Sequence, residues 1–463
     1  MISDHHRWDY LGAMDQVLVQ TPSLDGLAQR GTLLTGMHST TPLCVPQRIA
    51  ISSGRYPMNS HRYTNRQAVD PSMPTFLQSL RRAGVQTAMI GKFHHHVHTY
   101  DADFLSHEPD VHQLGYDYVH ETSGKQGVGT VGCECQYSMY LRRLGILKQF
   151  REWTGRWDQI PPKSKPNESW PWEWDTTQDA YIGKRGCEFL QGVRRDRPFF
   201  LHLGFVGPHP PFDAPDRYRE AYASIDPPAA NDGSLRDVDS WRAYSACISE
   251  VDFWVGEVLR TLQSQGLDDE TAVFYTSDHG DEAGDHGRWG KGTFYEGSVR
   301  VPFLAAGPGI PRKRRVEALA ELIDLGRTVC DLFGCDSHDL DQGVSLVRVL
   351  QGSRADHRPD VFAEMGSDKM LFDGRYKVMY CNLTKDRRTQ LQEPPINGPA
   401  FGRSVNLPPD IISVYDLVAD PSERNDLAED PAHAELVDRL RERLLNRIIV
   451  SMQSARESPG SVL

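Results

Sequence analysis

Residues 198–210 read PFFLHLGFVGPHP, a largely apolar run that stops at Gly207 and is followed by His209. Short runs of this kind, rich in aromatic and β-branched residues and ended by glycine or proline, are typical of buried strands. Residues 85–90 and 271–276 have the same character, and helical patterns occupy 74–83 and 238–265. This alternation predicts an α/β fold, with a large mixed, mostly parallel sheet sandwiched by helices.

Each of these predicted strands is followed by ionisable side chains. Lys92 and His94 follow the run at 85–90, and His209 follows the run that begins at residue 198. Asp278 and His279 follow the run at 271–276. Ligands of such sheets bind beyond the carboxyl ends of the strands. The sequence therefore predicts a charged site at one edge of the sheet.

The pattern changes near residue 355, and we expect a catalytic domain over residues 1–355. Residues 356–463 are expected to form a smaller C-terminal α+β subdomain with an antiparallel sheet. Its predicted elements are short strands at 361–364, 369–372 and 376–380, a Pro-rich loop at 384–410 and an amphipathic helix at 435–450.

Composition narrows the functional class. The net charge of -12 and the lack of a long Lys/Arg run argue against a nucleic-acid partner. No apolar stretch is long enough for a membrane span, and the first residues do not resemble an export signal. The eight scattered cysteines predict reduced thiols and neither a disulfide framework nor a paired zinc motif. As written, the chain is expected to be cytoplasmic.

The most informative motif is Cys44-Val45-Pro46-Gln47-Arg48, followed by Gly54-Arg55-Tyr56-Pro57. Taken alone, it fits a buried thiol before a helix. It resembles the signature of the formylglycine-dependent sulfatases of the alkaline phosphatase superfamily. In that family the cysteine of Cys-x-Pro-x-Arg is oxidised to formylglycine (3-oxoalanine) by a formylglycine-generating enzyme. The segment 414–427 also resembles the closing segment of sulfatase C-terminal subdomains.

The same resemblance implies a divalent metal site. Asp4 takes the place of the family's first metal aspartate, Asp278 and His279 resemble the third metal motif, and the converted Cys44 is the remaining ligand. His5 fits neither family variant at its position and is carried over only as a candidate ligand. Calcium is the family default, and the carboxylate oxygens also suit magnesium or manganese.

Four further motif residues are implied to bind sulfate or the hydrated aldehyde. They are Lys92 and His94 of Gly-Lys-x-His, His209 of Pro-His-x-Pro, and Lys291 of Gly-Lys-Gly; Arg48 is implied to stabilise the formylglycine and the metal site. Cations and donors of this kind stabilise the charge that develops on a sulfate ester. His95, His96 and His98 have no counterpart in the motif and are interpreted as a chance cluster.

The resemblance also implies a mechanism. One hydroxyl of the hydrated aldehyde attacks sulfur, Lys291 and His209 bind sulfate or protonate the leaving alcohol, and the second hydroxyl then expels sulfate. The expected substrate is an aryl or carbohydrate sulfate ester. The loops at 100–174 and 384–410 should line the pocket, where Trp170, Trp172 and Trp174 fit either a sugar platform or a core.

Two alternative functions stay open. A phosphonate monoester hydrolase or phosphodiesterase of the same superfamily often has histidine after the third-strand aspartate, as His279 does here. A non-catalytic binder of sulfated ligands would keep Cys44 as a thiol. Only three residues precede Asp4, so the first strand is expected to be truncated. If an export signal precedes it, the alternative location is periplasmic or secreted. The glycosylation sequon at Asn382 would matter only in that case.

Overall fold

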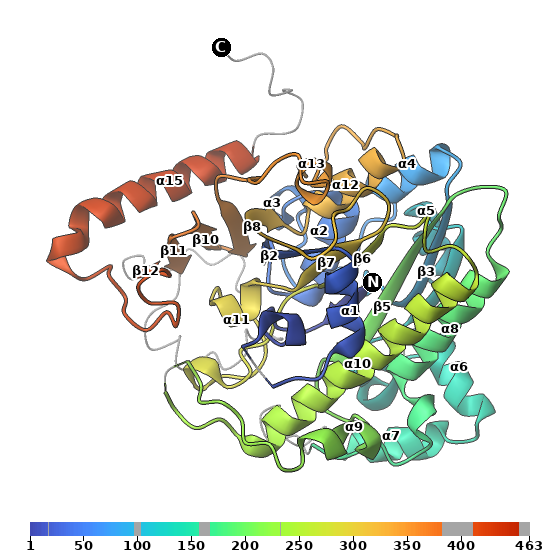
Figure 1. Ribbon diagram of the computed structural model, residues 1–463. Helices are drawn as coiled ribbons and strands as arrows, with labels where there is room; N and C mark the ends of the chain where they lie inside the picture. Colours follow the sequence, from blue (N-terminus) through green and yellow to red (C-terminus); the bar gives the residue numbers. More distant parts are fainter. Residues whose placement is uncertain (17, 97–102, 157–166, 232, 382–410, 453–463) are drawn as a thin grey trace.

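Two sheets organise the chain (Figure 1). The computed structural model describes residues 1–463 except 17, 97–102, 157–166, 232, 382–410 and 453–463. The eight-stranded sheet has the order β4-β3-β5-β1-β6-β7-β2-β8. Its strands are β1 (Ile2–Asp4), β2 (Thr32–His38), β3 (Gln86–Lys92), β4 (Tyr118–Thr122), β5 (Phe199–Pro208), β6 (Val273–Ser277), β7 (Phe303–Ala306) and β8 (Arg314–Glu321).

The strand pairing confirms the predicted mixed, mostly parallel sheet. All neighbouring pairs are parallel except those that β7 makes with β6 and β2. The second sheet is antiparallel, in the order β12-β11-β10-β9. Its strands are β9 (Val361–Met365), β10 (Asp368–Phe372), β11 (Tyr376–Cys381) and β12 (Ile411–Asp416).

Helices cover both faces of the large sheet. One face carries α1 (Pro22–Arg30), α8 (Gln178–Gly192) and α10 (Val238–Ser264), and the other carries α2 (Cys44–Ser53), α4 (Phe76–Arg82) and α12 (Asp324–Leu332). The other α-helices in the described residues are α3 (Pro57–Ser60), α5 (Glu108–Gln113), α6 (Gln136–Arg143), α7 (Leu147–Gly155), α9 (Asp216–Arg219), α11 (Glu296–Val299), α13 (Val347–Leu350) and α15 (Ala434–Met452).

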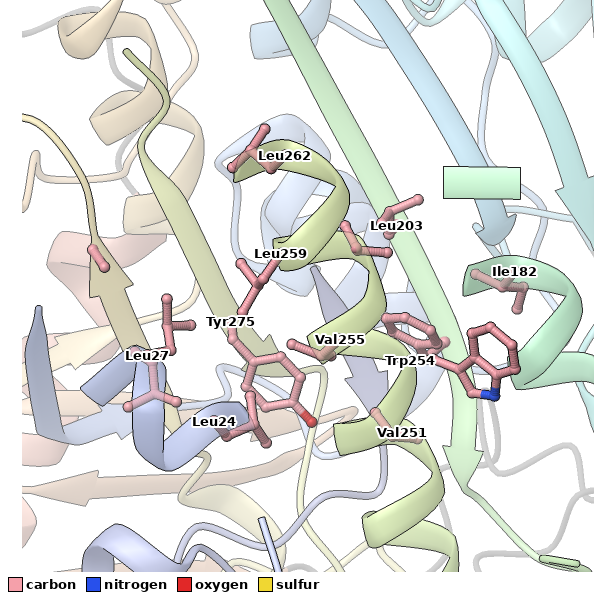
Figure 2. Close-up of a cluster of buried hydrophobic side chains, with 14 of the residues drawn as sticks. Leu24, Leu27, Ile182, Leu203, Val251, Trp254, Val255, Leu259, Leu262 and Tyr275 are labelled. Carbon is pink, nitrogen blue, oxygen red and sulfur yellow. The ribbon is translucent and has the colours of Figure 1, made fainter. Parts of the chain in front are cut away.

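Helix α10 shows how the sequence pattern becomes packing. Val251, Val255, Leu259 and Leu262 recur at helical spacing, so they form one apolar stripe. Figure 2 shows this stripe against α1 and against strands β5 and β6. The side chain of Asp237 caps the helix by accepting a hydrogen bond from the Ser240 amide. Burial of this stripe holds the helix on the sheet.

The strands predicted from apolar runs are found within one to two residues of their expected positions, as β3, β5, β6 and the first three strands of the small sheet. Strands β2, β4, β7, β8 and β12 were not predicted. The region 100–174, expected as loops, contains α5, β4, α6 and α7. The predicted loop at 384–410 and Asn382 lie outside the described residues. The expected division at residue 355 falls between α13 and β9 and stays a prediction.

Strand β1 is short and central. It consists of three residues between β5 and β6, and the Met1 ammonium group donates a hydrogen bond to the Phe274 carbonyl at 2.8 Å. A cavity of about 640 Å³, lined by Met1 and by residues of β5 and β6, adjoins this end of the strand. None of the helices in the described part of the chain is long and apolar enough to cross a membrane.

The small sheet is joined to the large domain by a buried cation. The Lys377 ammonium group on β11 donates to Glu296 of α11 and to Glu423, both at 2.7 Å, and to the Phe294 carbonyl at 3.0 Å. Its side chain has no solvent exposure. Removing one partner of a buried ion pair leaves the other charges without compensation, which is far costlier than losing a surface pair.

We therefore expect Lys377→Met to lower the free energy of unfolding by about 3 kcal/mol or more, because two buried carboxylates lose their counter-charge. Thermal melting of the variant and the parent protein measures this. The matched control is Lys148→Met, whose ammonium group is exposed and lies 3.8 Å from Glu152; it should shift stability by less than about 0.5 kcal/mol. Equal melting temperatures for both variants would contradict the assigned role of Lys377.

Candidate active site

Cys44 is placed by helix α2, which begins at this residue. All ten residues of α2 are buried. The amide of Val45 donates to the Asn65 side chain at 3.0 Å, and Pro46 has no amide hydrogen, so two of the donors left over at the start of the helix need no further partner. The helix therefore begins inside the protein and presents Cys44 at the edge of the sheet.

Arg48 lies one helical turn after Cys44 and links three elements. Its Nε donates to Asp278, just after β6, at 2.8 Å, and its Nη1 donates to the carbonyl of Lys92, the last residue of β3, at 2.7 Å. Both side chains of the ion pair are buried. The contacts fix α2 against the ends of β3 and β6.

Four side chains converge in front of these strands. The ligand atoms of Asp4, His5, Cys44 and His279 all lie within 4.8 Å of one another, and all four residues are buried. His279 Nε2 is 3.1 Å from Cys44 Sγ and 3.6 Å from both Asp4 Oδ1 and Asp278 Oδ1. This group contains Asp4, Cys44 and His279, three of the four metal ligands predicted from the sequence, together with the candidate ligand His5. The fourth predicted ligand, Asp278, lies beside the group and pairs with Arg48.

The two histidines present a ring nitrogen to this cluster. His279 Nδ1 donates to the Gly280 carbonyl at 2.9 Å, which directs Nε2 toward Cys44 and Asp4. His5 Nδ1 contacts Asp281 at 2.8 Å, and its buried Nε2 has no hydrogen-bond partner among the residues that the structure describes. A carboxylate behind a histidine orients such ligands in metal sites. The donor set of carboxylates and imidazoles therefore fits a divalent cation.

Cations surround the Cys44 thiol. Lys291 Nζ donates to Cys44 Sγ at 2.6 Å. Burial, the largest influence, and the charge of Asp4 would raise the pKa of the thiol, but Lys291, Lys92 and His279 outweigh them and lower it. An anion at position 44 is therefore stabilised by its neighbours.

Lys92 is the second cation. Its ammonium group contacts Asp4, and both side chains are buried. Burial alone would raise the pKa of Asp4, but Lys92, His209 and Lys291 hold it well below its usual range. Gly91 precedes Lys92 at φ 97°, and a Cβ there would lie 2.3 Å from the Gly204 carbonyl of β5. Only glycine allows this close approach of β3 and β5.

His209 and His94 enter from the ends of β5 and β3. The amides of Val206 and Gly207 donate to Asp179, which fixes the end of β5. His209 Nδ1 donates to the Pro210 carbonyl at 2.6 Å, and its ring lies edge-on to His5 with centroids 4.6 Å apart. His94 is buried with φ 59°, and its predicted contact with sulfate stays a prediction.

Asp281 was not identified from the sequence, although it follows His279 by two residues. A single acidic residue after Gly280 carries no signal of its own, because its role depends on reaching His5 across the fold. The tryptophans behave as core: Trp170 is buried against Phe150 and Trp153, and its indole donates to Thr176. Trp172 packs partly against the same cluster.

Comparison with known proteins agrees with this geometry. Residues 1–335 match the family model described as Sulfatase. The chain is similar to a choline-sulfatase of Rhizobium meliloti (27% identity, covering 89% of this chain and 78% of the relative) and to an arylsulfatase of Clostridium perfringens (27% identity, 83% and 87%). Its fold is similar to that of a phosphonate monoester hydrolase of Agrobacterium radiobacter (TM-score 0.73, 23% identity, covering 97% and 95%). The chain belongs to the sulfatase family of sulfuric ester hydrolases.

Proposed function

We propose that this chain hydrolyses an aryl or carbohydrate sulfate ester at residue 44, after a formylglycine-generating enzyme has converted Cys44 to formylglycine, with a divalent cation held beside it. The observation that carries the proposal is the 2.6 Å contact between Lys291 Nζ and Cys44 Sγ, at the centre of the Asp4, His5 and His279 cluster. The thiol sulfur occupies the place where an oxygen of the hydrated aldehyde would stand.

The cationic side chains suit a sulfate group at this position. Lys291 donates to residue 44, and Lys92, which contacts Asp4, is close enough to lower the pKa of the thiol; both would stabilise the negative charge of the sulfate oxygens. Lys92 is buried and Lys291 is half-buried, so water screens their charges only in part. The same groups favour the anionic form of a nucleophile at position 44.

The leaving alcohol needs a proton, and we assign this role to Lys291 or His209. Because the Nδ1 hydrogen of His209 is donated to the Pro210 carbonyl, His209 can give a proton from Nε2 only as the imidazolium, whereas the Lys291 ammonium group already carries its protons. Arg48 positions residue 44 through its bonds to Asp278 and Lys92 and does not need to touch the substrate. Asp4, His5, Asp278 and His279 are the residues that would hold the cation, calcium by family preference and manganese or magnesium as alternatives. When bound, the cation would lower the pKa of a hydroxyl on residue 44.

A phosphonate monoester or phosphodiester substrate is the second candidate. His279 supports it, because phosphonate monoester hydrolases of the superfamily often have histidine after the third-strand aspartate. This histidine lies 3.1 Å from Cys44, at a position where the alternative family residue is asparagine. The same cations and nucleophile suit a phosphorus centre of similar charge, so geometry at residue 44 does not separate the two substrates. Turnover rates do.

The metal assignment predicts a stability effect. Addition of calcium should raise the melting temperature, because a ligand that binds only the folded state stabilises it by about 2.7 kcal/mol at a hundred times its dissociation constant. Asp4→Asn should remove this shift, since it removes a carboxylate at the centre of the cluster. The control Asp196→Asn changes an exposed carboxylate paired with Arg194 and should keep the full shift. An equal calcium response in both variants would refute the proposed ligand set.

The reaction itself is tested by measuring hydrolysis of an aryl sulfate and an aryl phosphonate side by side, with protein co-expressed with a formylglycine-generating enzyme and supplied with calcium or manganese. We expect faster turnover of the sulfate. Cys44→Ala should lower kcat by at least about 10⁴-fold, in keeping with the loss of a covalent nucleophile.

The matched control is Cys187→Ala, a partly exposed cysteine of α8, which should retain activity. Faster turnover of the phosphonate would establish the second candidate with the same residues in the same roles. Full activity of Cys44→Ala would disprove both. A protein that keeps Cys44 as the thiol under these conditions and turns over neither ester would favour a non-catalytic binder of sulfated ligands.

A further inference from the structure

A second group of metal-binding side chains lies in the segment that follows β3. His95 and His96 are adjacent there but differ in their surroundings. Both ring nitrogens of His95 have partners, the Phe93 carbonyl at 2.9 Å and the Ser52 hydroxyl at 3.1 Å, and its ring stacks on Phe93. His95 is therefore a satisfied core histidine.

His96 has a different environment. It is 4% exposed, and its buried Nε2 has no hydrogen-bond partner in the part of the chain that the structure describes. Leaving a buried polar nitrogen unpaired costs about 1–3 kcal/mol, so such an atom points to a missing partner.

Two further ligands meet His96. His107 lies just before α5 and Asp110 lies in its first turn, and His107 Nδ1 is 3.4 Å from Asp110 Oδ2. One ligand atom from each of His96, His107 and Asp110 lies within 4.8 Å of the other two. The side chains of His107 and Asp110 are 43% and 38% exposed, so the group opens to solvent on one side. A cation can enter without opening the core.

We propose that His96, His107 and Asp110 form a second metal site, separate from the catalytic cluster, for a late first-row divalent cation with zinc preferred. Two imidazole nitrogens and one carboxylate oxygen are ligands that zinc accepts, and a water completes a four-coordinate site. Calcium is excluded as the preferred ion, because it takes six to eight oxygen ligands.

One adjustment accompanies binding. The rings of His96 and His107 stack with centroids 4.4 Å apart and planes 17° from parallel, so a single ion cannot lie in both ring planes as they stand. The exposed ring of His107 is the one free to turn, since His96 is enclosed. The bound ion would then tie the segment that carries Lys92 and His94 to α5.

The test is zinc binding by untagged, metal-free protein. Zinc can also bind the catalytic cluster, which offers imidazole nitrogens and a thiol, so the second site is measured as the difference in zinc stoichiometry between the parent protein and variants that leave that cluster unchanged. Isothermal titration calorimetry, with metal analysis of the gel-filtered protein, should show that the parent protein binds about one more equivalent of zinc than His107→Ala. Asp110→Asn should weaken binding at this site by at least about tenfold.

His107 and Asp110 are partly exposed, so these variants should fold, and His96→Ala is a further variant whose melting temperature must be checked. The matched control is His112→Ala, a histidine of the same helix that lies 3.4 Å from Glu108 and outside the group. It should bind zinc as the parent protein does. Equal zinc stoichiometry and affinity in the parent protein, His107→Ala and Asp110→Asn would overturn the proposal. The result does not depend on the substrate, since no turnover is measured.

Discussion

The active site depends on the buried ion pair between the Arg48 guanidinium and Asp278. The guanidinium lies one turn after Cys44 on α2, pairs with Asp278 after β6 and donates to the last carbonyl of β3. A buried charge is tolerated only when it is paired and hydrogen-bonded, so the positions of α2, β3 and β6 are coupled through this one side chain. Residue 44 is thereby set against Asp4, which ends the central strand β1, and against His279.

Local charge, and not the total, determines what this acidic protein binds. The net charge is -12, yet Lys92, Lys291 and Arg48 surround residue 44. Lys92 pairs with Asp4 and Arg48 pairs with Asp278, whereas Lys291 donates to residue 44 itself. Burial strengthens these interactions, because charges in the protein interior are screened less than charges in water. The field in a cleft is therefore set by the charged residues that line it. A tetrahedral anion is the ligand class that such an arrangement favours.

Much of this arrangement could be predicted from the sequence, because each predicted strand ended in ionisable residues and parallel strands bring their ends to one edge. The three-residue β1 and the four-residue β7 were too short for a periodic pattern, and β8 mixes charged with apolar residues. The orientation of the His5 ring depends on Asp281, which lies 276 residues away along the chain. The grouping of His96 with His107 and Asp110 likewise arises only when α5 packs beside the segment after β3. In the sequence, His96 stands next to His95 and away from His107 and Asp110, so it was interpreted as part of a chance cluster.

The central claim is that residue 44 acts as an aldehyde and not as a thiol, since neither cysteine nor serine can collapse to a carbonyl and release sulfate. The most direct measurement is the mass of the peptide containing Cys44, taken from protein that has been co-expressed with a formylglycine-generating enzyme and that hydrolyses a sulfate ester. The account predicts a peptide lighter than the thiol form and reactive toward an aldehyde-specific probe. An active preparation in which this peptide carries only the unmodified thiol would contradict it.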